Sequence, residues 1–367
     1  MSERILKKEE EDSFFVEDHD QPLPPDDVVA YNELRSCADL FRMYKNGKLE
    51  IQPDFQREVV WKQDERSRFI DSLVKQLPIP SMCFSLDAKT QSWKVIDGLQ
   101  RMSSIISFLG DAPWSLSAVD DIHPLLKNRS NVDLRKGSEE DKRLYSSVED
   151  MSIPITVIRC DYSVRSHMRY LFMIFNRLNS GGVRLNNQEI RNCIFSGKYN
   201  DMLKKFDADN REWQLVKKKT WGSMSRFRSV EILLRALAFA DNLERYNGNL
   251  AGFLNDFMDS ATKYDQSKID STREALFFMA SSAFKIVTNL PSGKKSLTFM
   301  EGLLVALVKN HERLRNIEDG NLRTLLGEKA LAYVSLPSFT NVQRYALSSE
   351  SIVKTRLREA ISLFASE

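Results

Sequence analysis

Apolar residues recur at helical spacing over most of the chain, and they gather in strand-like runs only in its first half. Strand-like runs cover residues 82–86 and 93–96, joined as a hairpin by a polar turn, and residues 153–158. Helical stripes in the first half cover residues 36–46, 102–109 and 164–178. From about residue 199 onward the pattern is almost wholly helical, with stripes over residues 229–240, 250–258, 274–287, 296–308 and 352–364. The pattern predicts an α+β first half followed by an all-helical second half.

Two stretches interrupt this pattern. Residues 1–30 are acidic, carry prolines between positions 22 and 25 and show no sustained periodicity, so we expect a flexible arm in which Phe14-Phe15-Val16 could dock. Residues 111–150 are polar, and we expect their central part, residues 135–141, to be a surface excursion. We therefore expect three parts, namely the acidic arm over residues 1–30, an α+β domain over residues 31–200 and a helical domain over residues 201–367.

Composition and targeting signals narrow the class of protein. The 367 residues are 42% hydrophobic and 28% charged, as in globular proteins. No apolar run approaches the roughly 20 residues that span a membrane, and residues 1–12 lack the apolar core of a secretory signal. We therefore expect a cytoplasmic protein with no membrane partner.

Cysteines and histidines are few and scattered. The four cysteines have no paired spacing (Cys37, Cys83, Cys160 and Cys193), which favours reduced thiols over a disulfide framework or a zinc site. The four histidines form neither an H-x-x-H nor an H-E-x-x-H pattern (His19, His123, His167 and His311). A histidine-rich nuclease centre within this chain is therefore not expected.

The net charge of +2 hides an asymmetry along the chain. Residues 1–28 contain 10 acidic and three basic residues, a net charge of −7, so the rest of the chain carries +9. A basic body with an acidic arm fits a partner that bears phosphate groups.

The most distinctive stretch is Trp93 to Arg101, where a strand-like run ends in Asp97-Gly98 and an amphipathic run begins at Met102. The dipeptide Asp-Gly strongly favours a turn, so we expect a strand, a tight turn and then a helix. Such a turn aims the backbone N–H groups of the helix start, and the Arg101 side chain, at one volume that suits a phosphate. Asp97 could hold a metal ion or orient a water molecule there. The alternative is an ordinary turn in which Arg101 pairs with Asp97.

Two further polar clusters follow apolar segments. Gln56-Arg57 stands before Val59-Val60-Trp61, and Phe175 leads through Asn179 to a turn with Gly181 and Gly182. Arginine binds phosphate oxygens bidentately, amides bind base or sugar edges, and glycine allows a close backbone approach. Beyond the glycines, Asn186 and Glu189 have the spacing of a capping box, which predicts the start of a helix.

Taken together, these clusters resemble the motifs of the N-terminal domain family of the GmrSD type IV restriction endonucleases, whose core is related to ParB and sulfiredoxin. The motifs are Pro53 to Arg57 with Trp61, the stretch from Ile96 to Arg101, and Phe175 to Gly182 leading to Leu185 and Glu189. The resemblance covers about residues 35–200, and the helical remainder resembles the usual continuation of the family. It implies a ParB/sulfiredoxin-like fold for the first domain. The commoner family form has Gln where this sequence has Leu99.

The resemblance implies a pocket that binds and hydrolyses a nucleoside triphosphate with Mg²⁺ and so controls restriction of foreign DNA. By position, the catalytic residues would be Asp97, Gln100 and Arg101, with Asp97 also the metal ligand, and the nucleotide-binding residues Gln56, Arg57, Gly98, Phe175, Asn179, Gly181 and Gly182. Many members carry a C-terminal His-Asn-His nuclease, which the four lone histidines cannot form. DNA, a partner nuclease or ATPase subunit, and a second copy of the chain are the partners expected. The alternatives are a sensor without turnover, and a direct nuclease that uses Asp97 and Glu189.

A basic cluster in the second half is a candidate nucleic-acid contact. It consists of Lys217, Lys218, Lys219, Arg226 and Arg228, with Trp213, Trp221 and Phe227 interleaved. Such a cluster could follow a phosphate backbone, and the alternative is a solvated loop before a buried helix. Glu231 and Arg235, spaced i and i+4 on the next helix, are expected to form a structural ion pair.

Overall fold

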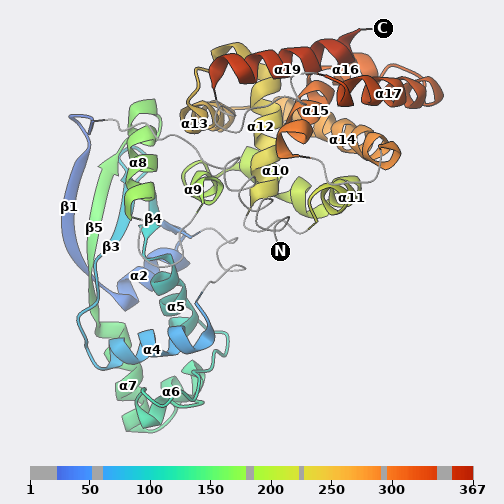
Figure 1. The fold of residues 1–367 in the computed structure, drawn as a ribbon. Coiled ribbons are helices and arrows are strands. Elements are labelled where there is room, and N and C mark those ends of the chain that lie inside the picture. The colour runs from blue at the N-terminus through green and yellow to red at the C-terminus, as the bar shows by residue number, and fades with distance from the viewer. Residues whose placement is uncertain are drawn as a thin grey trace. The chain divides into compact units, whose positions relative to one another are not determined.

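The computed structural model describes residues 23–51, 61–178, 186–222, 227–290, 296–336 and 349–366. Contacts between Cα atoms divide the chain into two compact units at residue 185 (Figure 1). We call residues 22–185 the sheet unit and residues 186–367 the helical unit. The predicted α+β class with a helical second half is confirmed. The predicted domain limits at residues 30 and 200 stay predictions, and the expected arm lies almost wholly outside the described residues.

The described part of the sheet unit contains one five-stranded sheet. Its strands are β1 (Val29–Ser36), β2 (Leu49–Glu50), β3 (Met82–Asp87), β4 (Trp93–Asp97) and β5 (Ser152–Cys160), in the order β1-β5-β3-β4-β2. The hairpin of β3 and β4 is antiparallel, as the sequence predicts, and β5 runs parallel to β3 and antiparallel to β1. The short edge strand β2 runs parallel to β4, with Leu49 opposite Trp93.

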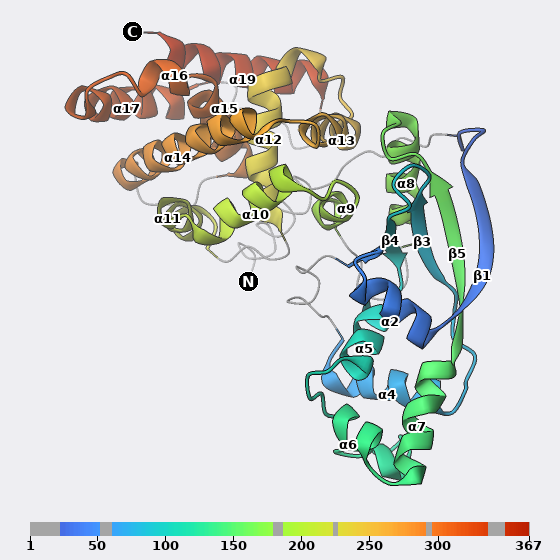
Figure 2. The same cartoon turned by 180° about the vertical axis from the view of Figure 1, so that it is seen from behind.

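Helices complete the sheet unit around one apolar core. They are α2 (Cys37–Lys45), α4 (Gln63–Val74), α5 (Leu99–Leu109), α6 (Asn131–Lys136), α7 (Glu139–Asp150) and α8 (Arg165–Leu178). Figures 1 and 2 show α4, α6 and α7 gathered at the end of the sheet where β5 begins, whereas α8 lies alongside the strands. The core joins apolar residues of the strands to those of α2, α4, α5 and α7. Strands β2, β3, β4 and β5 contribute buried residues to this core, whereas β1 contributes none.

The predicted surface excursion over residues 135–141 is exposed at Lys136 and at residues 138–140, whereas residues on either side of it belong to the core. Leu134 of α6 and Val148 of α7 are fully buried, and the ring of Tyr145 stacks on that of Phe108 at 5.3 Å. The amide of Asn131, also buried, donates to the carbonyl of Phe108 at 3.0 Å. Each of these short helices buries only a few apolar residues among many charged ones, so its polar composition conceals the buried stripe.

The helical unit contains helices and no strand among its described residues. These helices are α9 (Asn187–Ile194), α10 (Lys198–Asp209), α11 (Arg211–Thr220), α12 (Arg228–Asn242), α13 (Leu250–Ala261), α14 (Gln266–Asn289), α15 (Leu297–Lys309), α16 (His311–Leu314), α17 (Asp319–Val334) and α19 (Glu350–Ala365). The central helix α15 packs against α12, α14 and α19, which explains its nearly continuous apolar sequence. Within the described ranges, every helix is too short or too polar to cross a membrane.

A buried network of charges connects the central helices of this unit. Glu231 and Arg235 of α12 pair at 2.7 Å, as the sequence predicts, and both side chains are 3% exposed. Glu301 of α15 accepts from Arg235 at 3.4 Å and from Arg356 of α19 at 2.8 Å. Arg191 of α9 lies 3.6 Å from Glu231. Charges removed from water need such partners, so the network fixes the packing of α9, α12, α15 and α19.

We expect Glu301→Gln to lower the free energy of unfolding by about 3–5 kcal/mol, because it leaves two arginines buried without their shared carboxylate. The measurement is chemical denaturation followed by circular dichroism. Glu244→Gln is the matched control, because Glu244 pairs with Arg358 at the surface of the same unit. Equal midpoints for the two variants would show that the network adds nothing to stability.

Candidate functional site

The candidate site is built on the turn from β4 to α5. Strand β4 ends at Asp97, and Gly98 adopts φ +95° in the left-handed region that favours glycine. A Cβ atom on Gly98 would lie 2.5 Å from Cγ of the buried Met82, so the turn is in close contact with the start of β3. Helix α5 begins at Leu99, three residues before the predicted start at Met102. Gln100 and Arg101 therefore lie in the first helical turn.

Arg101 is held by three neighbouring groups. Its Nη2 atom donates to Oδ2 of Asp97 at 2.8 Å, and its guanidinium also donates to the carbonyl oxygens of Pro80 and Ser81. Burial lowers the pKa of Arg101, and the Asp97 carboxylate partly offsets that effect. The structure thus contains the Arg101–Asp97 pair that the sequence left open as an alternative. The guanidinium, still charged at neutral pH, links the segment before β3 to the turn.

Asp97 remains accessible despite this pair. Its side chain is 42% exposed, and among the described residues no group donates a hydrogen bond to its Oδ1 atom. Asp97 lies opposite Cys83 in the β3–β4 ladder. Burial, reinforced by the Asp97 carboxylate, raises the pKa of the Cys83 thiol to about 12. Cys83 is therefore protonated at neutral pH, so the chemistry available here is that of the carboxylate and the guanidinium.

Gln100 connects this turn to the segment that carries the first motif. The backbone N–H of Trp61 donates to Oε1 of Gln100 at 3.4 Å, and the ring of Trp61 packs edge-on against Phe69 at 5.7 Å. Gln56 and Arg57 themselves lie outside the described residues. Strand β2 runs parallel to β4, so the chain after it heads toward the end of β4 that carries Asp97. The described chain stops at Ile51 and resumes at Trp61, which contacts Gln100. Both flanks of the Gln56-Arg57 segment are thus placed next to β4 and α5.

The third motif is only partly described. Phe175 of α8 is 3% exposed, and α8 contacts β4. Asn179, Gly181 and Gly182 lie outside the described residues. Asn186 and Glu189 form the predicted capping box, with the backbone N–H of Glu189 donating to Asn186 at 2.9 Å and that of Asn186 to Glu189 at 2.5 Å. Glu189 is buried and serves to begin α9.

Sequence reasoning missed Arg66, a half-buried cation that contacts α5. It lies on α4, and its guanidinium donates to the Ser103 carbonyl at 3.3 Å and to the Ser107 hydroxyl at 2.5 Å, over the ring of Trp114. Burial lowers the pKa of Arg66. These contacts fix α4 against α5. The available signal is that Arg66 precedes Phe69 and Ile70 by three and four residues, which places a charge on the apolar stripe.

The described residues contain no cluster of three or more carboxylate, thiol or imidazole groups that could hold a metal ion. Magnesium, however, is commonly bound by one or two carboxylates together with the phosphates of a substrate. The exposed carboxylate of Asp97 fits that mode of binding, whereas it does not fit a metal site made of protein ligands alone.

The basic cluster of the helical unit divides into bound and exposed cations. Lys217 pairs with Asp207 at 2.9 Å and is 13% exposed, whereas Lys218 and Lys219 are exposed. Trp213 and Trp221 are buried against each other, so they cannot serve as stacking surfaces for bases, contrary to what their spacing suggested. Arg228 is half-buried in the first turn of α12, and Arg226 lies outside the described residues.

Comparison with protein-family models matches residues 37–196 to the GmrSD restriction endonuclease, N-terminal domain. The match begins with α2 and ends just after α9, so it includes the β4–α5 turn and all three motif segments. No curated protein and no solved structure matches the chain.

We expect Gly98→Ala to lower the free energy of unfolding by about 1–3 kcal/mol more than Gly47→Ala, measured by chemical denaturation. Both glycines have positive φ in the sheet unit, but a Cβ on Gly47 would meet nothing within 4 Å. The difference therefore isolates the clash with Met82. Equal losses would mean that the turn does not need its close contact with β3.

Proposed function

Since residues 37–196 belong to the GmrSD restriction endonuclease N-terminal domain family, we propose that the chain is a component of a DNA restriction system whose sheet unit binds and hydrolyses a nucleoside triphosphate. The observation that carries this proposal is the contact between Trp61 and Gln100. It brings the flank of the Gln56-Arg57 segment to the turn that holds Asp97 and Arg101. In this proposal the two motifs, about 40 positions apart in the sequence, supply cations and a carboxylate to one nucleotide site.

In this proposal the β4–α5 turn receives the phosphates. The N–H groups at the start of α5, together with the Arg101 guanidinium, stabilise negative charge that develops on the phosphoryl oxygens. Asp97 orients the attacking water molecule or holds the metal ion. A magnesium ion bound with the triphosphate would supply further neutralisation of the phosphate charge. Gln100 acts as a positioning residue, because it holds the end of the preceding segment.

The remaining motif residues complete the nucleotide site in this proposal. Gln56 and Arg57 contact the nucleotide, and Asn179, Gly181 and Gly182 contribute backbone and amide contacts beside it. Phe175 is buried, so it supports the end of α8 rather than stacking openly on a base. The Arg101–Asp97 pair holds both side chains in place until phosphates compete for the guanidinium.

DNA would be contacted by the helical unit and cut by a partner nuclease. The exposed Lys218 and Lys219, with Arg226 and Arg228, are the candidate contacts to the phosphate backbone. Direct cleavage through Asp97 and Glu189 is the less favoured function, because Glu189 is buried in its capping box. A sensor that binds nucleotide without turnover is the second candidate, favoured by the engagement of Arg101 with Asp97.

Phosphate release from nucleoside triphosphates, with Mg²⁺ and with or without DNA, tests the hydrolase. We expect Asp97→Asn and Arg101→Ala to lower turnover at least about a hundredfold. The first removes the carboxylate that orients the water molecule or holds the metal ion, and the second removes the cation that stabilises charge on the phosphoryl oxygens. Arg68→Ala is the matched control, since Arg68 pairs with Asp121 at the surface of the same unit.

Wild-type turnover in folded Asp97→Asn and Arg101→Ala would refute the proposed hydrolysis. Absence of turnover in the wild type, together with nucleotide-dependent thermal stabilisation that Arg101→Ala abolishes, would instead establish the sensor.

DNA binding at several salt concentrations tests the helical unit. We expect Lys218→Ala or Lys219→Ala to weaken binding at low salt and to reduce the slope of log K against log salt by about 1 each, because each phosphate contact releases counterions. Lys309→Ala, which removes an exposed lysine elsewhere in the same unit, should leave the slope unchanged. An unchanged slope in all three variants would place the DNA contact elsewhere.

A further inference from the structure

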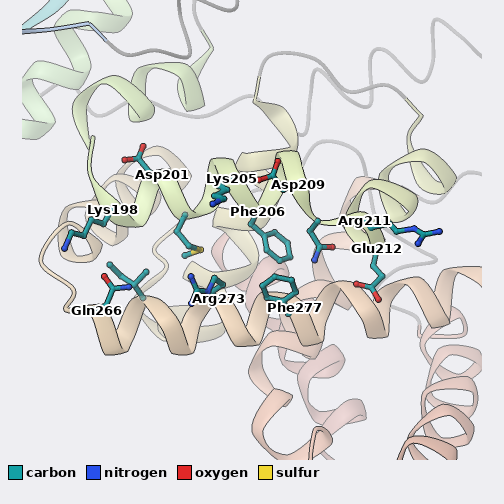
Figure 3. Close-up of a pocket in the computed structure, with 13 residues that line it drawn as sticks. Lys198, Asp201, Lys205, Phe206, Asp209, Arg211, Glu212, Gln266, Arg273 and Phe277 are labelled. Atoms are coloured by element: carbon teal, nitrogen blue, oxygen red, sulfur yellow. The ribbon is translucent and has the colours of Figure 1, made fainter.

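A groove of about 760 Å³ lies within the helical unit, between α10 and α14 (Figure 3). Its rim carries basic and acidic side chains together, among them Lys205, Arg273, Asp209 and Glu212. A rim of mixed charge selects neither an anionic nor a cationic ligand. The sheet unit, in contrast, contains a row of side-chain hydrogen bonds that ends at the candidate site.

This row crosses the sheet from its edge strand β1. Asn32 of β1 lies directly opposite Thr156 of β5, and the Thr156 hydroxyl donates to Oδ1 of Asn32 at 2.8 Å. The Ser81 hydroxyl, just before β3, lies 3.1 Å from Oγ1 of Thr156 and also reaches the carbonyl of Met82 at 3.1 Å. Because the single hydroxyl proton of Thr156 goes to Asn32, Ser81 is the donor to Thr156. We call Asn32, Thr156 and Ser81 the polar row.

The segment that carries Ser81 has few other polar contacts. Pro78 and Pro80 lack a backbone N–H, and among the described residues no backbone–backbone hydrogen bond involves residues 78–81. Ile79 packs against the apolar core, which holds the segment on the unit but does not set the direction of its carbonyl groups. The bond from Ser81 to Thr156 therefore anchors the segment to the sheet next to those carbonyls.

Arg101 is held by the carbonyl groups of this same segment. Its guanidinium donates to the carbonyl oxygen of Pro80, and both of its Nη atoms lie 3.4 Å from the carbonyl oxygen of Ser81. The Arg101 side chain is only 14% exposed, so water can replace these acceptors only in part. Because the guanidinium is planar and rigid, a shift of the carbonyls turns the whole group relative to Asp97.

We propose that the polar row positions Arg101, so that its guanidinium faces the phosphates of the nucleotide. The inference rests on the proposed function of the β4–α5 turn. Thr156 and Asn32 would act as positioning residues, because they reach Arg101 only through Ser81. The edge strand β1 would thereby belong to the framework of the nucleotide site, although it contributes no group that contacts the ligand.

A double-mutant comparison of unfolding, without nucleotide, tests the connection from Thr156 to Arg101. Thr156→Val removes the hydroxyl with little change of shape, and chemical denaturation gives the unfolding equilibrium constant. We expect its effect on that constant to differ at least about threefold between the wild type and Arg101→Ala, as for residues of one hydrogen-bond network. A general effect of valine on the strand cancels in this comparison. Arg101→Lys, which loses the planar fork, replaces Arg101→Ala if that variant does not fold.

The matched control for this comparison is Arg68→Ala, because Arg68 pairs with Asp121 at the surface of the same unit. Thr156→Val should have the same effect in Arg68→Ala as in the wild type. An effect of Thr156→Val that is equal in the wild type and in the Arg101 variants would overturn the proposal.

Nucleotide turnover provides a readout that a merely structural role would not move. We expect Thr156→Val to lower kcat at least about threefold while KM changes less than about twofold, because Arg101 acts on charge that develops in the transition state. Thr156→Ser keeps the hydroxyl and should retain the wild-type kcat. An unchanged kcat in Thr156→Val, or an equal loss in Thr156→Ser, would overturn the positioning role.

The two measurements separate this inference from the proposed function. Absence of turnover in the wild type would refute the hydrolysis, whereas the unfolding comparison needs no nucleotide and would decide whether the polar row holds Arg101. An active wild type in which Thr156 and Arg101 act independently would overturn the inference and leave the proposed function standing.

Discussion

The bonds of the Arg101 guanidinium are the interaction on which the candidate site depends. One planar group joins the carboxylate at the end of β4 to the backbone just before β3. Gly98 makes this possible, because only a residue without Cβ fits between the turn and Met82. The same turn begins α5, to which Gln100 attaches the chain at Trp61. Geometry within the five positions from Asp97 to Arg101 thus places the elements from which a phosphate site can be assembled.

Much of this fold could be predicted from the sequence, because its signals are local. Alternation and helical periodicity located the β3–β4 hairpin, α8, and α12, α13, α14, α15 and α19 of the second half. The spacing of Asn186 and Glu189 located the start of α9. Strands β1 and β2 were missed. Both lie at edges of the sheet, where β1 leaves most of its side chains exposed and β2 has only two residues.

The remaining features depend on contacts between distant residues, which no local pattern records. The sequence placed Asp97 and Arg101 correctly at the junction of a strand and a helix, but it left their pairing open. It did not show that Trp61 reaches Gln100. The sequence does not distinguish Lys217 from its two exposed lysine neighbours, because its ion pair with Asp207 exists only in the folded chain. The helical spacing of Glu231 and Arg235 predicted their pairing, whereas the addition of Glu301 and Arg356 requires the tertiary structure.

The buried charge network also bears on the order in which the helical unit can fold during synthesis. Glu301 shares its carboxylate between Arg235, which is translated well before it, and Arg356, which is translated 55 residues after it. Until α19 leaves the ribosome, a closed core would hold this glutamate with only one of its two arginines. Early collapse of α12 on α15 is therefore disfavoured, and the last helix completes the core. We therefore expect the core of this unit to close only after α19 has been synthesised.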